Sequence, residues 1–161
     1  MTRGPVVICG ARGFVGSQLV RHLLGQDVEV RAGTRSPERA RQSDPNVHWV
    51  ELEVERPETL DRAFAGAESV VYLVHQMRSE SSDLEALEVR SARHVAEAAA
   101  RAGVSRIVYL GGPSPEGPAS KHLRARLATG DTFRAGTVPT VELRAGMIIG
   151  AHSESWLIVR D

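Results

Sequence analysis

This sequence of 161 residues has only one cysteine, no long apolar run and no excess of either charge. A single cysteine, Cys9, cannot form an intrachain disulfide, which fits the reducing cytoplasm. Its apolar surroundings favour a buried structural thiol over a reactive one. No apolar run reaches about 18 residues, so we expect no membrane-spanning helix. The first residues carry no apolar core followed by small cleavage-site residues, so no secretory signal is expected either.

The net charge of zero further restricts the classes of partner that we expect. The 20 basic and 20 acidic side chains cancel. A neutral chain has no long-range field that would draw nucleic acid or an anionic membrane, so neither is expected as a partner. The six histidines are scattered, without the close spacing or the cysteine partners of a metal site, so no metal is expected. These absences predict a cytoplasmic protein whose partners are small molecules or other proteins.

Strand-like and helical segments alternate along the whole chain. Short runs rich in β-branched residues predict strands at Val6–Cys9, Val28–Ala32, Val47–Leu52, Ser69–Val74, Arg106–Leu110 and Thr140–Leu143. Amphipathic or alanine-rich stretches predict helices at Phe14–Leu24, from Pro37, from Pro57 to about Ala65, at Leu84–Ala102 and from about Ser120 to Ala135. This alternation predicts an α/β Rossmann fold, a doubly wound parallel sheet in the order 3-2-1-4-5-6 with helices on both faces.

A glycine-rich loop, Gly10-Ala11-Arg12-Gly13-Phe14-Val15-Gly16, joins the first predicted strand to the first predicted helix. Gly10 permits a tight exit from the strand, Gly13 lets the backbone approach a pyrophosphate, and Gly16 lets the helix pack close to the strand. The helix then offers its free N–H groups to the phosphates. A glycine motif alone can be an ordinary tight turn. Its place in the first βαβ unit nevertheless predicts a dinucleotide site made by every residue of the loop except Ala11.

The end of the second predicted strand decides between the two nicotinamide cofactors. An NAD enzyme usually carries Asp or Glu there, which holds the 2′-hydroxyl of the adenine ribose. Here the sequence reads Gly33-Thr34-Arg35-Ser36, without an acid, and Arg35 is able to bind a 2′-phosphate through two charge-assisted hydrogen bonds. Arg12 in the glycine loop could add a second contact. Each arginine could instead be a solvated surface charge, but together they favour NADP, with NAD as the alternative.

Further positions are expected along the cofactor. Glu53 follows the third strand, where an acid near the adenine is common in this fold. The segment Leu73–Met77 ends the fourth strand and should lie along the nicotinamide ribose, with Val74 and His75 as neighbours. A lone loop histidine is more often a positioning or bystander group than a catalytic one, so we interpret His75 as a cofactor contact. Gly111, after the fifth strand, is expected at the same edge of the sheet.

Five pieces of the sequence resemble one known group: Ile8–Gly16, Thr34-Arg35, Tyr72–His75, Arg106–Gly112 and Leu143–Gly146. They are similar to the atypical short-chain dehydrogenase/reductases. Within these they resemble NmrA-like NAD(P)H-binding proteins, of the bacterial nucleoside-diphosphate-sugar epimerase or NADH-flavin reductase type. The resemblance extends over essentially all 161 residues. The glycine loop is shared by the whole superfamily, whereas the Tyr-Leu-Val-His and Tyr-Leu-Gly-Gly pieces are more particular.

The resemblance implies an active-site tyrosine and lysine, spaced Tyr-x-x-x-Lys, at the start of the fifth helix, and a Ser or Thr after the fifth strand. This chain has His122 and Arg126 at the tyrosine and lysine positions. Gly111 and Gly112 stand where the hydroxyl is expected, with Ser114 two residues on. Either His122 is an acid/base and Arg126 holds the ribose or a substrate anion, or both lie on an exposed helix face without a chemical role. The missing hydroxyl favours the second interpretation.

Three functions are compatible with these residues. The first is an atypical NADP-dependent oxidoreductase that acts on a small carbonyl, quinone or flavin; hydride transfer to a flavin or quinone needs no catalytic tyrosine. The second is a non-catalytic module that senses NADPH and changes its association with a regulatory protein partner. The third, sugar-nucleotide epimerisation, depends on the missing tyrosine. Steady NADPH oxidation would separate the first function from the second.

The last residues bear on the domain organisation. One NAD(P)-binding Rossmann domain accounts for residues 1–161. An apolar segment, Trp156–Val159, begins just before the end, and an apolar face without a partner is unusual in a complete domain. We therefore expect a fragment of a longer protein, lacking the C-terminal part that shapes the substrate pocket.

Overall fold

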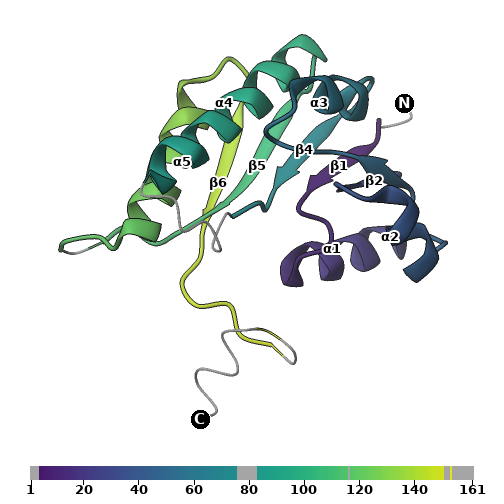
Figure 1. Cartoon of the computed structure of the whole chain (residues 1–161), viewed down its shortest axis with the longest axis horizontal. Coiled ribbons are helices and arrows are strands. Elements are labelled where there is room, and N and C mark those ends of the chain that lie inside the picture. The colour runs from purple at the N-terminus through teal and green to yellow at the C-terminus, as the bar shows by residue number, and fades with distance from the viewer. Residues whose placement is uncertain (1–3, 76–82, 116, 151–152, 154–161) are drawn as a thin grey trace.

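The computed structural model describes residues 4–75, 83–115, 117–150 and 153, which form a parallel sheet flanked by helices (Figure 1). The strands are β1 (Val6–Cys9), β2 (Val30–Thr34), β3 (Trp49–Glu51), β4 (Ser69–Tyr72), β5 (Arg106–Gly111) and β6 (Thr140–Arg144). The helices are α1 (Phe14–Leu24), α2 (Pro37–Ser43), α3 (Pro57–Phe64), α4 (Leu84–Arg101) and α5 (Lys121–Ala135). The strand order is β3-β2-β1-β4-β5-β6 and every pairing is parallel, so the predicted Rossmann topology is confirmed.

Helices cover both faces of the sheet, with α3, α4 and α5 on one side and α1 and α2 on the other (Figure 1). The larger core lies under α3, α4 and α5, and in it the rings of Tyr72, Tyr109 and Phe133 pack with centroids 5.0, 5.5 and 6.0 Å apart. The smaller core includes Ile8 and Trp49. Because the central strands are covered on both faces, their sequences read as short, nearly continuous apolar runs.

Cys9, the last residue of β1, belongs to the larger core and is fully buried. Burial raises the pKa of its thiol to about 12, because the charged thiolate would lose its hydration there. The thiol is therefore protonated at neutral pH and unreactive. This confirms the interpretation of Cys9 as a structural residue.

The second strand lies two residues further along than the pattern indicated. It covers Val30–Thr34 rather than Val28–Ala32. The Val28 N–H donates to the Leu23 carbonyl at 3.3 Å, in the turn after α1, so it is not available to the sheet. β3 is likewise shorter than predicted, because its pairing with β2 extends only from Trp49 to Glu51. Propensity alone does not show where a neighbouring strand stops pairing.

The fourth strand ends at Tyr72 rather than Val74. Its last pairing partner in β1 is Cys9, and Gly10, with φ +88°, turns the chain away directly after it. The prediction of Ser69–Val74 was therefore too long at its carboxyl end, because the glycine loop ends the pairing. The other element boundaries agree with the prediction to within one residue.

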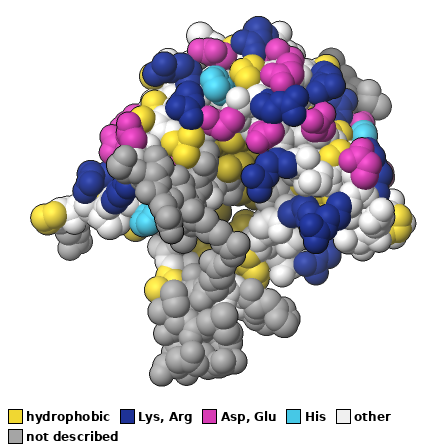
Figure 2. Space-filling model, viewed as in Figure 1, with side chains coloured by type: hydrophobic (Ala, Val, Ile, Leu, Met, Phe, Trp, Pro, Cys, Tyr) yellow, Lys and Arg dark blue, Asp and Glu magenta, His cyan; other side chains and the backbone are white. Residues whose placement is uncertain are grey.

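Figure 2 shows basic and acidic side chains interspersed over the face turned to the viewer, in line with the zero net charge. Within the described ranges, no helix is long and apolar enough to span a membrane. Two predicted segments, Gln76-Met77 beside the cofactor and the apolar Trp156–Val159, lie outside the described residues.

Candidate functional site

The glycine loop leaves β1 by a turn that glycine adopts far more readily than other residues. Gly10 has φ +88°, and a Cβ at this position would lie 3.1 Å from the carbonyl carbon of Leu73. Gly16 is tighter still, because its Cβ would lie 2.2 Å from the carbonyl oxygen of Gly10. Because these two glycines lack a side chain, β1, α1 and the end of β4 can pack close together.

Gly13 directly precedes α1 as its N-cap residue and leaves the first turn of the helix open. Its N–H donates to the Gly10 carbonyl at 3.0 Å, and its own carbonyl accepts the Ser17 N–H at 2.9 Å. As the N-cap residue it has no side chain to accept from the helix, and the first turn carries no acidic residue. The free N–H groups and the helix dipole therefore favour an anion in front of Phe14 and Val15.

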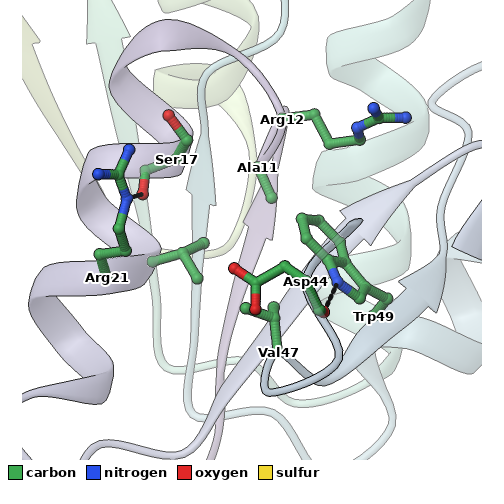
Figure 3. Close-up of a pocket in the computed structure, with 8 residues that line it drawn as sticks. Ala11, Arg12, Ser17, Arg21, Asp44, Val47 and Trp49 are labelled. Carbon is green, nitrogen blue, oxygen red and sulfur yellow. Dashed lines mark hydrogen bonds between the residues drawn. The ribbon is translucent and has the colours of Figure 1, made fainter. Parts of the chain in front are cut away.

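Two exposed arginines lie near the end of β2. Thr34 is buried as the last residue of the strand, and Arg35 is exposed directly after it. Arg12 extends from the glycine loop on the side of Trp49 in β3 (Figure 3), and β2 lies between β1 and β3 in the sheet. Among the described carboxylates, none forms an ion pair with either arginine. Both guanidinium groups are therefore available to a phosphate.

A hollow of about 300 Å³ lies beside Arg12, between α1 and β3 (Figure 3). Buried apolar side chains and a polar rim line it: Ala11, Val20, Val47 and Trp49, with Arg12, Ser17, Arg21 and Asp44. The indole N–H of Trp49 donates to the carbonyl oxygen of Asp44 at 2.9 Å, which fixes the ring. A ligand bound near Arg12 would therefore change the environment of a tryptophan, and fluorescence can report it.

Glu53 follows β3 as predicted, and its backbone anchors α3. Its N–H donates to the hydroxyl of Thr59 at 2.9 Å, and Thr59 is fully buried. The carboxylate lies 4.0 Å from the guanidinium of Arg56, with 35% of the Glu53 side chain exposed. Because this carboxylate is partly exposed, it remains accessible to a ligand. The contact between Glu53 and the adenine stays a prediction.

The end of β4 meets the glycine loop directly. The Leu73 N–H donates to the Cys9 carbonyl at 3.0 Å. A Cβ on Gly10 would lie 3.3 Å from the backbone nitrogen of Val74, which is half-buried against the larger core. The structure thus brings Gly10 and Val74 together between β1 and β4. The strand order reverses at this point, and Rossmann folds bind dinucleotides there.

His75 follows Val74 and packs its ring edge against Tyr109, with ring centroids 6.5 Å apart. Burial lowers the pKa of the imidazole from its ordinary value of 6.5 to about 4. The positive charge of Arg126 acts in the same direction, and the Leu110 carbonyl opposes both. His75 is therefore neutral at pH 7. Neither ring nitrogen is reached by solvent or makes a hydrogen bond of normal geometry with a described residue.

Arg126 and His122 lie one turn apart on α5 but face different surroundings. His122 is exposed. Arg126 is half-buried, and its Nη2 donates to the carbonyls of Leu110 and Gly111, each at 3.1 Å. Its own carbonyl accepts the hydroxyl of Tyr109 at 2.9 Å. The predicted placement on an exposed helix face is therefore confirmed for His122. It is wrong for Arg126, because its guanidinium donates hydrogen bonds to the carbonyls at the end of β5 and is half-buried there.

Gly111 lies against a buried acid that no sequence motif indicated. A Cβ on Gly111 would lie 2.5 Å from Oε1 of Glu142, a side chain that is 8% exposed. Glu142 pairs with Arg134 and Arg144, and Arg144 donates to the hydroxyl of Ser114. Gly111 therefore makes room for a structural carboxylate. Ser114, the nearest hydroxyl after β5, is tied to the end of β6.

The segment after β6 returns to the glycine loop. A Cβ on Gly150 would lie 2.7 Å from Cζ of Phe14, so two residues from opposite ends of the sequence are in contact. The Gly150 N–H donates to the hydroxyl of Ser153 at 3.2 Å, which closes a turn. Met147 and Ile149 are 61% and 49% exposed nearby in the sequence. Sequence reasoning missed this segment, because only its exposed apolar side chains distinguish it and they follow no motif.

Residues 10–160 match the model of a family that is described as NAD(P)H-binding. The chain belongs to this NAD(P)H-binding family. It is 31% identical over 156 residues to the ceramide reductase of Caulobacter vibrioides, which covers 92% of this chain and 47% of that protein. It is 34% identical to cinnamoyl-CoA reductase 1 of Oryza sativa subsp. japonica over 116 residues. This alignment covers 65% of this chain and 33% of that protein.

Among solved structures, this NAD(P)H-binding chain is similar to the triphenylmethane reductase of Citrobacter sp. complexed with NADP(H). The TM-score is 0.73 and the identity 26%, over 87% of this chain and 48% of the other. The resemblance to the atypical short-chain dehydrogenase/reductases is therefore confirmed. The chain spans less than half the length of each of these three relatives.

The carboxyl edge of the sheet fits the cofactor of this NAD(P)H-binding family. A Cβ on Gly10 or Gly16 would fill the cradle of the loop, and the first turn of α1 is open to a pyrophosphate. Arg35 is free to bind a phosphate at the end of β2. His75 carries unpartnered polar atoms at the end of β4. Among the described residues, no group of three or more His, Cys, Asp or Glu side chains could hold a metal ion.

Proposed function

We propose that this chain binds NADP(H) in preference to NAD(H) and is the cofactor-binding part of an NADP-dependent reductase. The end of β2 carries the proposal. Arg35 is exposed there without an acid beside it in the sequence, and Arg12 extends from the glycine loop on the side of Trp49 (Figure 3). An acid in this place would repel a 2′-phosphate, whereas a guanidinium binds it through two parallel hydrogen bonds.

The proposed substrate is a small carbonyl compound, a quinone or a flavin. The relatives support reduction, because a ceramide reductase, a cinnamoyl-CoA reductase and a triphenylmethane reductase are all similar to this chain. The bound nicotinamide supplies the hydride, so the protein has to bind, orient and exclude water. Gly13 and the first turn of α1 would hold the pyrophosphate. Val74 and His75 would border the nicotinamide half, since the second mononucleotide lies over β4–β6.

A second candidate function is an NADPH-sensing module whose occupancy changes its binding to a regulatory protein. One observation favours it: of the two residues in place of the catalytic tyrosine and lysine, His122 is exposed and Nη2 of Arg126 already donates to the carbonyls of Leu110 and Gly111. Steady oxidation of NADPH with menadione or free flavin as acceptor distinguishes the two functions. Multiple turnovers per chain support the reductase. Tight NADPH binding without turnover supports the sensor.

Titration with NADPH and NADH, followed by tryptophan fluorescence or calorimetry, tests the cofactor preference. We expect NADPH to bind at least about tenfold more tightly, a difference of about 1.4 kcal/mol. Arg35→Ala should weaken NADPH binding by about 10- to 100-fold, because it removes a charge-assisted pair of hydrogen bonds, and should leave NADH binding nearly unchanged.

The matched control is Arg39→Ala. It also removes an exposed arginine, but one that lies four residues after Arg35, in α2. It should change neither affinity by more than about twofold, because an exposed charge that makes no direct contact with the ligand contributes little. Equal affinities of the unaltered chain for NADPH and NADH would contradict the preference. A loss of NADPH affinity in Arg39→Ala as large as in Arg35→Ala would show a nonspecific charge effect instead.

A further inference from the structure

The tertiary structure places the charge of Arg126 near a histidine other than the one the sequence suggested. His122 is exposed in the first turn of α5. Arg126 reaches the end of β5 instead, where its charge acts on His75 from the end of β4. Tyr109 connects the two, since its ring contacts His75 and its hydroxyl donates to the Arg126 carbonyl. His75 and Arg126 therefore form one polar cluster at the carboxyl ends of β4 and β5.

This cluster contains polar atoms that lack partners. Nδ1 and Nε2 of His75 and Nε of Arg126 are all screened from solvent without a hydrogen bond of normal geometry. A buried donor or acceptor left unpaired destabilises a fold, and such groups are rare unless something else completes them. The cluster lies over β4 and β5, on the half of the sheet that receives the second mononucleotide of a dinucleotide.

We propose that the imidazole of His75, with Arg126 beside it, forms a hydrogen bond to the nicotinamide riboside half of the bound cofactor, in the place of the absent lysine. This rests on the proposed NADP(H) function. The roles within the pair are divided. Nη2 of Arg126 is committed to the carbonyls of Leu110 and Gly111, so the arginine anchors α5 to β5. His75 keeps at least one ring nitrogen for the ligand, because the Leu110 carbonyl is the one described acceptor that acts on the ring.

The protonation state of His75 suits such a contact. Burial and the Arg126 charge keep the ring neutral at pH 7. A neutral imidazole has one donor and one acceptor nitrogen. A ribose hydroxyl and a carboxamide likewise each offer a donor and an acceptor, so either would match the ring. An imidazolium, with two donors, would match less well.

Two ligands separate this contact from the rest of the cofactor site. NADP⁺ contains both mononucleotides, whereas adenosine 2′,5′-bisphosphate keeps the adenine side with its 2′-phosphate and lacks the nicotinamide riboside. We expect His75→Ala to weaken NADP⁺ binding by about three- to tenfold, as one neutral hydrogen bond predicts, and to leave bisphosphate binding unchanged. His75→Gln, which retains a donor and an acceptor, should recover part of the loss. His122→Ala should change neither affinity.

The ratio of the two dissociation constants in one variant is the deciding quantity, because a partly misfolded sample changes both in the same proportion. Equal weakening of both ligands in His75→Ala would show a purely structural role and overturn the proposal. Unchanged binding of both would overturn it as well. Arg35→Ala should weaken both ligands, which identifies the adenine side. If the unaltered chain binds neither ligand, the proposed NADP(H) function fails, and this contact with it.

Discussion

Replacement of Gly13 by alanine is expected to lower the affinity for NADPH by about 100-fold or more, about 2.7 kcal/mol, while the fold stays intact. Gly13 has φ −70°, which every residue adopts, and it is exposed. A Cβ there would lie 3.3 Å from the Gly10 carbonyl oxygen, a contact that a small shift relieves. The same methyl group would stand in front of the open first turn of α1. It would therefore keep a pyrophosphate away from the N–H groups.

Gly16→Ala should behave differently, because its Cβ meets backbone rather than ligand. The atom would lie 2.2 Å from the Gly10 carbonyl oxygen and 2.9 Å from Cα of Ala11, and backbone cannot move aside cheaply. We expect a loss of unfolding free energy of about 3 kcal/mol or more, together with the loss of NADPH binding. Gly117→Ala is the control, since its Cβ would meet nothing within 4 Å.

Urea unfolding and NADPH titration of the three variants separate the two kinds of glycine. Gly13→Ala should retain the midpoint of the unaltered chain and lose the ligand, whereas Gly16→Ala should lose both. Full NADPH affinity in a folded Gly13→Ala chain would mean that the pyrophosphate does not approach the loop, and the cofactor site would have to lie elsewhere. Full stability of Gly16→Ala would contradict the close packing of α1 on β1.

The second large effect expected is an acid-dependent loss of stability due to His75. Its pKa falls from 6.5 to about 4 on folding, so the folded chain disfavours the protonated ring. The neutral form is favoured above pH 6.5, and the contribution to the unfolding free energy is complete there. As the pH falls from about 6.5 toward 4, the unfolded chain binds a proton that the folded chain does not. The loss reaches about 3 kcal/mol at the lower end of this window.

His75→Gln isolates this loss from the titration of the carboxylates, because glutamine does not titrate and every acid is retained. Urea unfolding of both chains at several pH values between 7 and 4 gives the comparison. The unaltered chain should lose about 3 kcal/mol more than the variant over this range. Parallel pH profiles for the two chains would show that His75 titrates alike in the folded and unfolded states. The ring would then not be buried as described.

Much of this protein could be predicted from local pattern. The alternation of apolar runs and amphipathic stretches determined the strand order, because right-handed crossovers leave few ways to connect parallel strands. The glycine loop could be placed as well, since each glycine has a steric reason that depends only on strand, turn and helix following one another. The absence of an acid after β2 can likewise be read from the sequence alone. These features depend on residues close together in the sequence.

Which residues meet on the nicotinamide side of the site could not be predicted from the sequence, because it depends on tertiary packing. The buried residues of α5 are Ala125, Thr129, Gly130 and Phe133, and only one of them is a large apolar side chain. The sequence therefore gives little sign of which face of α5 turns toward the sheet. That rotation turns Arg126 toward the carbonyls at the end of β5, where its charge acts on His75, and it also places Gly130 beside the carboxylate of Glu142.

The sequence by itself thus determined the Rossmann fold and the glycine loop, because both follow from short-range geometry and from the steric needs of glycine. Only the tertiary structure decided which polar groups meet at the ends of β4, β5 and β6. Those contacts join residues far apart along the chain, such as His75 with Tyr109 and Phe14 with Gly150. Their formation depends on how each helix is rotated when its small buried residues pack, and no local pattern records that rotation.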